Sequence, residues 1–427
     1  MTRRIMLWYR NDLRVHDHEA LHCAVREGAQ ILPVFIDSPT LGRHPLPGNP
    51  HIPSFRRKFR LESLIELDQR WREWNGSLVV MSGEPDQVIP HLCAKYGIDE
   101  VFLNAEASDD EYRQYQQLAR NLQSAPTSCR LFYGASMIHP EDLPFELQDL
   151  PDIFTQYRKL VEARLRVRAC FATPTAVQAL PHQETPFEPQ LPQTIVDVRS
   201  ALPFQGGESA GHHRLQHYLW ESDAIRTYKE TRNGLIGTDY SSKLSPWLAN
   251  GCLSAQHVFH EVRRYETERV ANDSTYWMIF ELLWRDYFRL VMEKFGTALF
   301  SLQGISPRNA SPPRGRHIGT FEKWVNGRTG DRFIDANMRE LLSTGFMSNR
   351  GRQNVASHFV HDLGMDWRLG AQYFEELLVD YNVYSNWGNW AYVAGVGNDP
   401  RENRRFNIAR QANMYDPAGT YQALWLD

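Results

Sequence analysis

Short apolar runs alternate with amphipathic segments over the first 135 residues of the chain. Residues 54–74 place apolar side chains at steps of three and four, which predicts a helix with one buried face. The apolar runs have the length and composition of strands; they cover residues 5–9, 31–36, 78–80, 100–103 and 130–132. This alternation predicts a doubly wound parallel sheet, whose ligands bind beyond the carboxyl ends of the strands.

The pattern changes after this region. Residues 172–205 contain six prolines and little periodicity, as expected for a segment that crosses between domains. Beyond Gly206 the strand pattern stops and amphipathic helices follow. We therefore predict an α/β domain over residues 1–135, an interdomain connector over 136–205 and an all-α domain over 206–427.

Composition narrows the possible functions. The 427 residues include 47 basic and 51 acidic side chains, which excludes a protein that binds nucleic acid through bulk charge but leaves room for a local basic groove. Nine of the 12 tryptophans lie from Trp220 onwards. This enrichment suggests that the helical domain binds a flat aromatic ligand, a nucleic acid or both, although a large tryptophan-rich core would give the same count.

The cysteines and the N-terminal run indicate a reduced, cytoplasmic protein. The five cysteines are widely spaced and form no CxxC pair, so neither a disulfide scaffold nor a thiolate zinc site is supported. The apolar run at residues 5–9 is too short for a signal-peptide core, and no stretch approaches the ~20 apolar residues of a membrane span. We expect no membrane association.

Two histidine groups have spacings that resemble metal sites. Neither group has a convincing third ligand nearby in the sequence, so we expect no metal site. The groups are His16, His18 and His22, and His212, His213 and His217.

A helical segment at residues 281–288 carries candidate recognition chemistry. Glu281, Trp284, Arg285 and Phe288 fall on one face, because their spacing is i, i+3, i+4 and i+7. An acid, an indole and a guanidinium on one face can hydrogen-bond to a base and stack on it. An ion pair at a helix surface is the simpler interpretation.

Three further segments are rich in polar groups. Residues 349–354 hold two arginines and three amides, which suit phosphate oxygens or flavin carbonyls, and equally a solvated turn. Residues 380–390 alternate aromatic and amide side chains, a pattern that core packing alone explains poorly. Residues 240–245 combine hydroxyls with one lysine, which suits a pyrophosphate or a helix cap.

These segments, in this order, resemble the photolyase/cryptochrome family over essentially the whole chain, beginning at residues 8–17. The match to the cryptochrome DASH branch is carried by residues 142–145, 228–234, 239–247, 344–357 and 385–390. The resemblance implies a light-driven flavoprotein with an α/β antenna domain and a helical FAD-binding domain.

The resemblance also implies which residues contact cofactors. The FAD phosphates would be held by Tyr228, Ser241, Ser242, Lys243, Leu244 and Ser245. The flavin and adenine would be lined by Arg285, Asn349, Arg352, Asp380 and Asn382. Asn386 would face flavin N5, and Glu106 matches the acid that contacts a folate antenna, 5,10-methenyltetrahydrofolate, in the family.

A DNA-facing surface is implied as well. Glu281 and Trp284 would meet a flipped pyrimidine dimer, and with Asn386 they are the expected catalytic residues. Arg350 would contact a DNA phosphate. Gln353 and Tyr392 stand where photolyases active on double strands carry methionine and tryptophan, which favours a single-stranded substrate.

The expected route of electrons to the flavin is incomplete in this sequence. Trp390 and Trp367 match the flavin-proximal and middle tryptophans of the family, but no tryptophan lies between residues 301 and 323, where the third is expected. The route would then end at a tyrosine or leave by Trp324. Asn382 also replaces a family aspartate beside the flavin.

Together these features lead to one main hypothesis and two alternatives. The main hypothesis is a monomer that repairs cyclobutane pyrimidine dimers in single-stranded DNA by electron transfer from excited, reduced FAD. The first alternative is a blue-light photoreceptor that binds DNA or protein without efficient repair. The second is a flavin-free binding protein.

Overall fold

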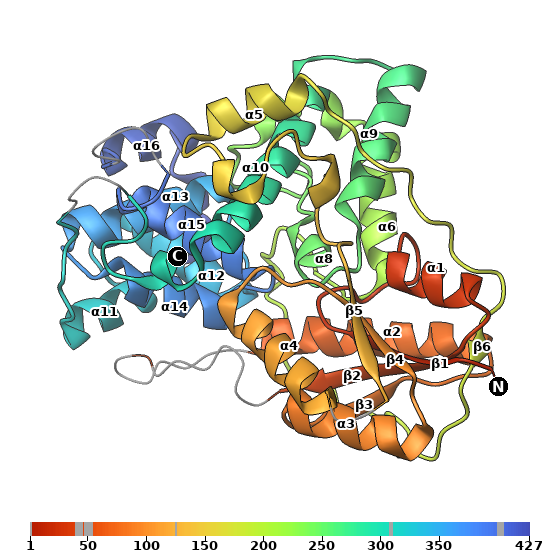
Figure 1. The fold of residues 1–427 in the computed structure, drawn as a ribbon. Helices are drawn as coiled ribbons and strands as arrows, with labels where there is room; N and C mark the ends of the chain where they lie inside the picture. The colour runs from red at the N-terminus through yellow and green to blue at the C-terminus, as the bar shows by residue number, and fades with distance from the viewer. Residues whose placement is uncertain (1, 39–45, 47–53, 124–125, 307–310, 399–404) are drawn as a thin grey trace.

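A parallel sheet forms the N-terminal part of the computed structural model, which describes residues 2–38, 46, 54–123, 126–306, 311–398 and 405–427. The strand order is β3-β2-β1-β4-β5 (Figure 1). The strands are β1 (Arg4–Tyr9), β2 (Gln30–Asp37), β3 (Val79–Ser82), β4 (Glu100–Asn104) and β5 (Ser128–Phe132). In register, Ile5 of β1 pairs with Ile31 of β2 and with Glu100 of β4. All five predicted strands are confirmed.

Helices cover both faces of the sheet, as predicted for a doubly wound fold. Ile5 and Leu7 of β1 pack in the apolar cluster of α1 and α2, whereas Met6 and Trp8 pack in that of α3 and α4. Strand β1 is thus buried on both sides, which explains its unbroken apolar run. The helices are α1 (Glu19–Arg26), α2 (Phe55–Glu73), α3 (Pro85–Tyr96) and α4 (Asp109–Leu122).

The connector contains structure that the sequence did not predict. Helix α5 (Phe154–Glu162) packs against the helical domain, and the short strand β6 (Gln178–Ala179) pairs in parallel with β2. The proline-rich segment therefore returns to the sheet before it enters the helical domain. Strand β6 was missed because a two-residue strand has no periodicity to detect.

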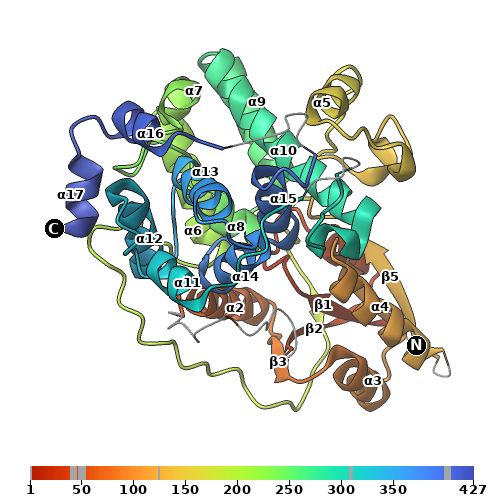
Figure 2. The same ribbon diagram turned by 90° about the vertical axis from the view of Figure 1, so that its left-hand side faces the viewer.

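From residue 206 onwards the described part of the chain holds helices and no strand. Figures 1 and 2 show the long helix α10 beside α15, with α13 and α14 close by. The helices are α6 (Glu208–Gln216), α7 (Tyr228–Thr231), α8 (Ser245–Ala249), α9 (Ala255–Glu268), α10 (Asp273–Phe295), α11 (Ile318–Val325), α12 (Arg332–Thr344), α13 (Asn349–Ser357), α14 (Trp367–Leu377), α15 (Val383–Val393), α16 (Ile408–Tyr415) and α17 (Thr420–Leu426).

The sheet and the helices share one apolar core. The cluster that contains Ile5 and Phe59 of the α/β domain also contains Trp247 of α8 and Tyr287 of α10. A second cluster, mostly of the helical domain, holds Trp324, Trp367, Trp387 and Trp390, among others. Among the described helices, none has the length and apolar character that crossing a membrane would need.

Candidate functional site

Three of the polar segments meet at the buried carboxylate of Asp380, which lies just before α15. Arg352 of α13 donates from Nη2 to both carboxylate oxygens, at 3.0 and 2.8 Å. Ser245, at the start of α8, donates its hydroxyl to Oδ2 at 2.6 Å. Asp380 therefore joins segments that are far apart in the sequence, and residues 349–354 lie on a helix rather than in a solvated turn.

The loop before α8 holds a buried cation. Lys243 adopts a φ of 53° and donates from Nζ to the Thr238 carbonyl at 2.7 Å, while its ammonium lies 3.3 Å from the centre of the Tyr240 ring. Burial lowers the pKa of Lys243 to about 7, and the nearby Arg214 guanidinium adds to the shift. A desolvated ammonium bound to a carbonyl rather than a carboxylate suits a phosphate anion.

Helices α10 and α15 supply the groups expected beside a flavin. Arg285 of α10 donates to the carbonyls of Ala135, at 2.5 Å, and Leu248, at 3.1 Å. Asn386 of α15 is buried and donates from Nδ2 to the Ala371 carbonyl at 3.0 Å. Asn382 caps α15 by accepting the backbone N–H of Ser385 at 3.1 Å. These contacts fix the two amides and Arg285 in place.

The remaining cofactor candidates lie outside the hydrogen-bonded cluster of Asp380, Arg352 and Ser245. Tyr228 is buried on α7 with its ring against Tyr218. Asn349 is exposed in the first turn of α13. The hydroxyl residues Ser241 and Ser242 are half-buried, and Leu244 packs in the shared core. Their expected roles as phosphate and adenine contacts stay predictions.

Glu281 forms an ion pair with Arg232, which follows α7. Burial raises the pKa of Glu281, although the Arg232 guanidinium opposes that shift. The neighbouring Asn233 accepts from Nη2 of Arg350 at 3.0 Å, and Nη1 of the same arginine donates to Gln353 at 2.9 Å. The candidate DNA contacts on α10 and α13 are therefore linked through two consecutive residues, Arg232 and Asn233.

Trp284 extends this surface to α15. Its ring stacks on Phe154 of α5, with centroids 3.7 Å apart and planes at 11°, and meets the Tyr392 ring edge-on at 5.8 Å. We call Arg232, Asn233, Glu281, Trp284, Arg350, Gln353 and Tyr392 the recognition surface.

Arg232, Asn233 and Phe154 were not identified as site residues from the sequence. Arg232 and Asn233 lie within the family-like string at 228–234, which could have drawn attention to them. Phe154 lies in the connector, where nothing in the sequence marks a partner for Trp284.

Glu106 lies at the predicted ligand-binding edge of the sheet. Glu106 follows β4 and accepts a hydrogen bond from Nδ2 of Asn11 at 3.1 Å. Asn11 lies in the loop that follows β1. Burial and the charge of Glu106 raise the pKa of the nearby Glu111 to about 7. Arg10 has buried Nε and Nη1 atoms without a hydrogen-bond partner. Polar atoms left unpaired at this edge fit a site that receives a polar ligand.

The two tryptophans of the expected electron route have different ring neighbours. Trp390 meets Trp324 at 6.2 Å and Phe374 at 5.1 Å, whereas Trp367 meets Trp387 at 5.7 Å. Trp324 in turn lies 5.7 Å from Tyr373. Aromatic contact from Trp390 thus continues to Trp324, the exit considered from the sequence.

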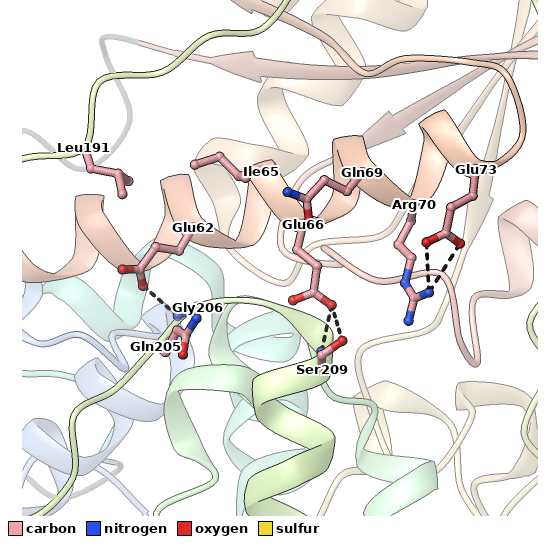
Figure 3. Close-up of a pocket in the computed structure, with 10 residues that line it drawn as sticks. All are labelled: Glu62, Ile65, Glu66, Gln69, Arg70, Glu73, Leu191, Gln205, Gly206 and Ser209. Carbon is pink, nitrogen blue, oxygen red and sulfur yellow. Dashed lines mark hydrogen bonds and ion pairs between the residues drawn. The ribbon is translucent and has the colours of Figure 1, made fainter.

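A cavity of about 600 Å³ lies elsewhere, between α2 and the start of α6. Figure 3 shows Glu62 accepting the Gly206 N–H and Glu66 accepting from Ser209 across it. Its lining includes three glutamates and one arginine. An acidic lining is unsuited to flavin phosphates or DNA, so this cavity is not the cofactor site.

Two family descriptions match the chain. Residues 5–182 match DNA photolyase, and residues 277–427 match the FAD-binding domain of DNA photolyase.

Similar proteins extend over the whole chain. A Synechocystis protein named cryptochrome DASH is 46% identical over 99% of this chain and 87% of its own length. One from Xenopus laevis is 46% identical over 100% of this chain and 83% of its own. The solved structure of Synechocystis cryptochrome superposes with a TM-score of 0.95 at 45% identity, covering 100% of this chain and 89% of that one. A class III photolyase from Agrobacterium tumefaciens gives 0.83 at 26% identity, covering 100% and 86%.

Proposed function

Because the chain belongs to the cryptochrome DASH branch of the photolyase/cryptochrome family and is a photolyase-like FAD protein, we propose that it repairs cyclobutane pyrimidine dimers in single-stranded DNA under blue or near-ultraviolet light. The observation that carries this proposal is the recognition surface. The acid Glu281 and the indole Trp284 lie on one face of α10, and the consecutive residues Arg232 and Asn233 link Glu281 to the Arg350 cation of α13.

The chain's part in repair is to bind and orient the damaged bases. A dimer pairs and stacks poorly, so flipping it out costs less than flipping normal bases, and a single strand lowers the cost further. Phe154 covers one face of Trp284, and Phe288 and Tyr392 also contact this half-buried indole, so a base would stack on the part that stays exposed. One such stack contributes about 1–3 kcal/mol.

Glu281 and the amides provide polar contacts for the reaction. Glu281 hydrogen-bonds the dimer once its side chain turns from Arg232, and burial raises the pKa of this carboxyl. Asn386, fixed by the Ala371 carbonyl, presents its amide to the flavin. FAD, when bound, would supply single-electron chemistry to a dimer held beside it.

Repair is tested by light-dependent loss of dimers from a short irradiated oligonucleotide, with reductant present. Matched single- and double-stranded substrates should be compared, and we expect turnover on the single strand to be the greater. Protein that contains FAD and changes its spectrum in light, yet leaves dimers intact on both substrates, would instead be the photoreceptor considered from the sequence.

Arg350→Ala is expected to weaken DNA binding and its dependence on salt. The logarithm of the binding constant falls linearly with the logarithm of the salt concentration. Removing one phosphate contact should make this slope less steep by about 0.7 for a single strand. Fluorescence anisotropy with a labelled oligonucleotide at several salt concentrations measures this slope. The matched control is Arg113→Ala, because Arg113 is an exposed arginine on α4; equal slopes for the two variants would remove Arg350 from the DNA contacts.

Trp390→Phe and Trp324→Phe are both expected to slow photoreduction of bound FAD, because the two rings are in contact and Trp390 matches the flavin-proximal tryptophan of the family. Absorbance at the flavin band during illumination measures the rate. Trp425→Phe, in the same core, controls for general loosening. A normal rate in Trp324→Phe would direct the route through Trp367 instead.

The antenna site is a second proposed ligand site. We propose that the edge formed by Arg10, Asn11 and Glu106 binds a folate of the methenyltetrahydrofolate class. The unpaired atoms of Arg10 and the carboxylate of Glu106 provide donors and acceptors for a pterin-like ring.

A further inference from the structure

Three histidines from three separate segments converge at the junction of the two domains. His16 follows β1, His212 lies on α6 and His257 on α9. Their ring centroids are 5.4 Å apart for His16 and His212, and 4.7 Å apart for each of the other two pairs. The sequence placed His16 and His212 in separate groups that each lacked a third ligand, and the fold brings them together.

Glu208 completes the arrangement. It is buried one turn before His212 on α6, with its Oε1 3.7 Å from Nε2 of that histidine. One potential ligand atom from each of His16, Glu208 and His212 lies within 4.8 Å of the other two, and among the described residues this is the one such group of three. Zinc bonds of ~2.0–2.1 Å place tetrahedral ligand atoms about 3.3 Å apart. Small side-chain rotations would close the difference.

The backbone around these groups is held in place. The Glu208 carboxylate accepts the N–H of Val15 and that of His16, each at 2.9 Å. Arg14 donates to the His16 carbonyl at 3.1 Å and to the Gly251 carbonyl, before α9, at 2.9 Å. The loop that carries His16 is therefore tied to both neighbouring helices, so little ordering remains for an ion to impose.

We propose that His16, Glu208 and His212 bind one divalent metal ion of the zinc class. The His257 ring packs against the rings of both histidine ligands. Two imidazoles and a carboxylate form a known type of zinc ligand set, and imidazole also suits copper and nickel. The ion would link a loop of the α/β domain directly to α6 of the helical domain. This site is independent of the proposed repair reaction, because none of its ligands belongs to the recognition surface.

The test uses the tag-free, FAD-containing protein stripped with a chelator and titrated with zinc chloride. We expect one zinc per chain after desalting, measured by elemental analysis, and a binding isotherm of matching stoichiometry. At 100 times the Kd, linkage should raise the Tm by about 3 °C for a chain of this length, and chelator should reverse the rise.

Two variants on one helix decide the assignment. His212→Ala should weaken zinc binding at least about tenfold and remove the rise in Tm. His213→Ala removes an exposed neighbour on α6 and should bind zinc as the parent does. If His212→Ala loses FAD or its helical spectrum, His16→Gln replaces it in the comparison. The proposal would be overturned if the parent bound no zinc, or if the ligand variants bound zinc as tightly as the parent. It would also be overturned if His213→Ala lost as much zinc affinity as His212→Ala.

Discussion

Asp380→Ala is expected to cause the largest loss of bound FAD among single substitutions in the helical domain. The change removes the acceptor of Arg352 and of Ser245 together and leaves the arginine without its carboxylate partner. Breaking a buried ion pair in this way costs about 3–5 kcal/mol. If a comparable part of that cost falls on the cofactor site, FAD affinity falls at least about 100-fold. Flavin fluorescence released on dilution measures the affinity.

The control for Asp380→Ala is Asp366→Ala. Asp366 has the same side-chain exposure as Asp380, 2%, and is paired with Arg316 and Arg368. Its loss should lower the free energy of unfolding to a similar extent while FAD stays bound. If the two variants released FAD equally, the effect of Asp380 would be general destabilisation, and its assignment to the cofactor site would fail.

Glu281→Ala is expected to reduce repair of single-stranded dimers about 10- to 100-fold with FAD still bound. The substitution removes one hydrogen bond of a charged or protonated carboxyl, an interaction of about 1.5–3 kcal/mol. It also leaves Arg232 without its carboxylate partner beside the site. Initial repair rates on an irradiated oligonucleotide, at saturating light, give the ratio.

Two further variants make the interpretation of Glu281→Ala specific. Glu281→Gln keeps a side chain that can hydrogen-bond and should retain more repair than Glu281→Ala. Glu268→Ala removes an exposed glutamate of α9 and should leave repair unchanged. Normal repair by Glu281→Ala would exclude this residue from the repair mechanism. It would not contradict the conclusion that the protein binds FAD.

The sheet was predictable because its strands have a local signal. Strand β1 is buried on both faces and therefore has an unbroken apolar run, and α2 has one apolar face that recurs every three or four residues. The connector was harder, since α5 is short and β6 contains only two residues. Hydrophobic periodicity cannot identify an element that is too short for its pattern of apolar positions to repeat.

The candidate site was predictable in its residue types but not in its contacts. The polar segments at 240–245, 349–354 and 380–390 stood out, yet nothing in the sequence shows that Ser245, Arg352 and Asp380 share a hydrogen-bonded cluster. The pairing of Glu281 with Arg232 and the cluster of His16 with His212 are also tertiary. Such contacts depend on helix packing across the chain, for which a single sequence carries no periodic signal.

The common core of the sheet and the helices has a consequence for biosynthesis. Ile5 and Phe59 leave the ribosome long before Trp247 and Tyr287, the aromatic residues that cover the same cluster. A nascent chain of the first 135 residues therefore exposes hydrophobic surface and is prone to self-association. Expression of the α/β half alone should yield insoluble material, and chaperone demand in the cell should last until α10 has been translated.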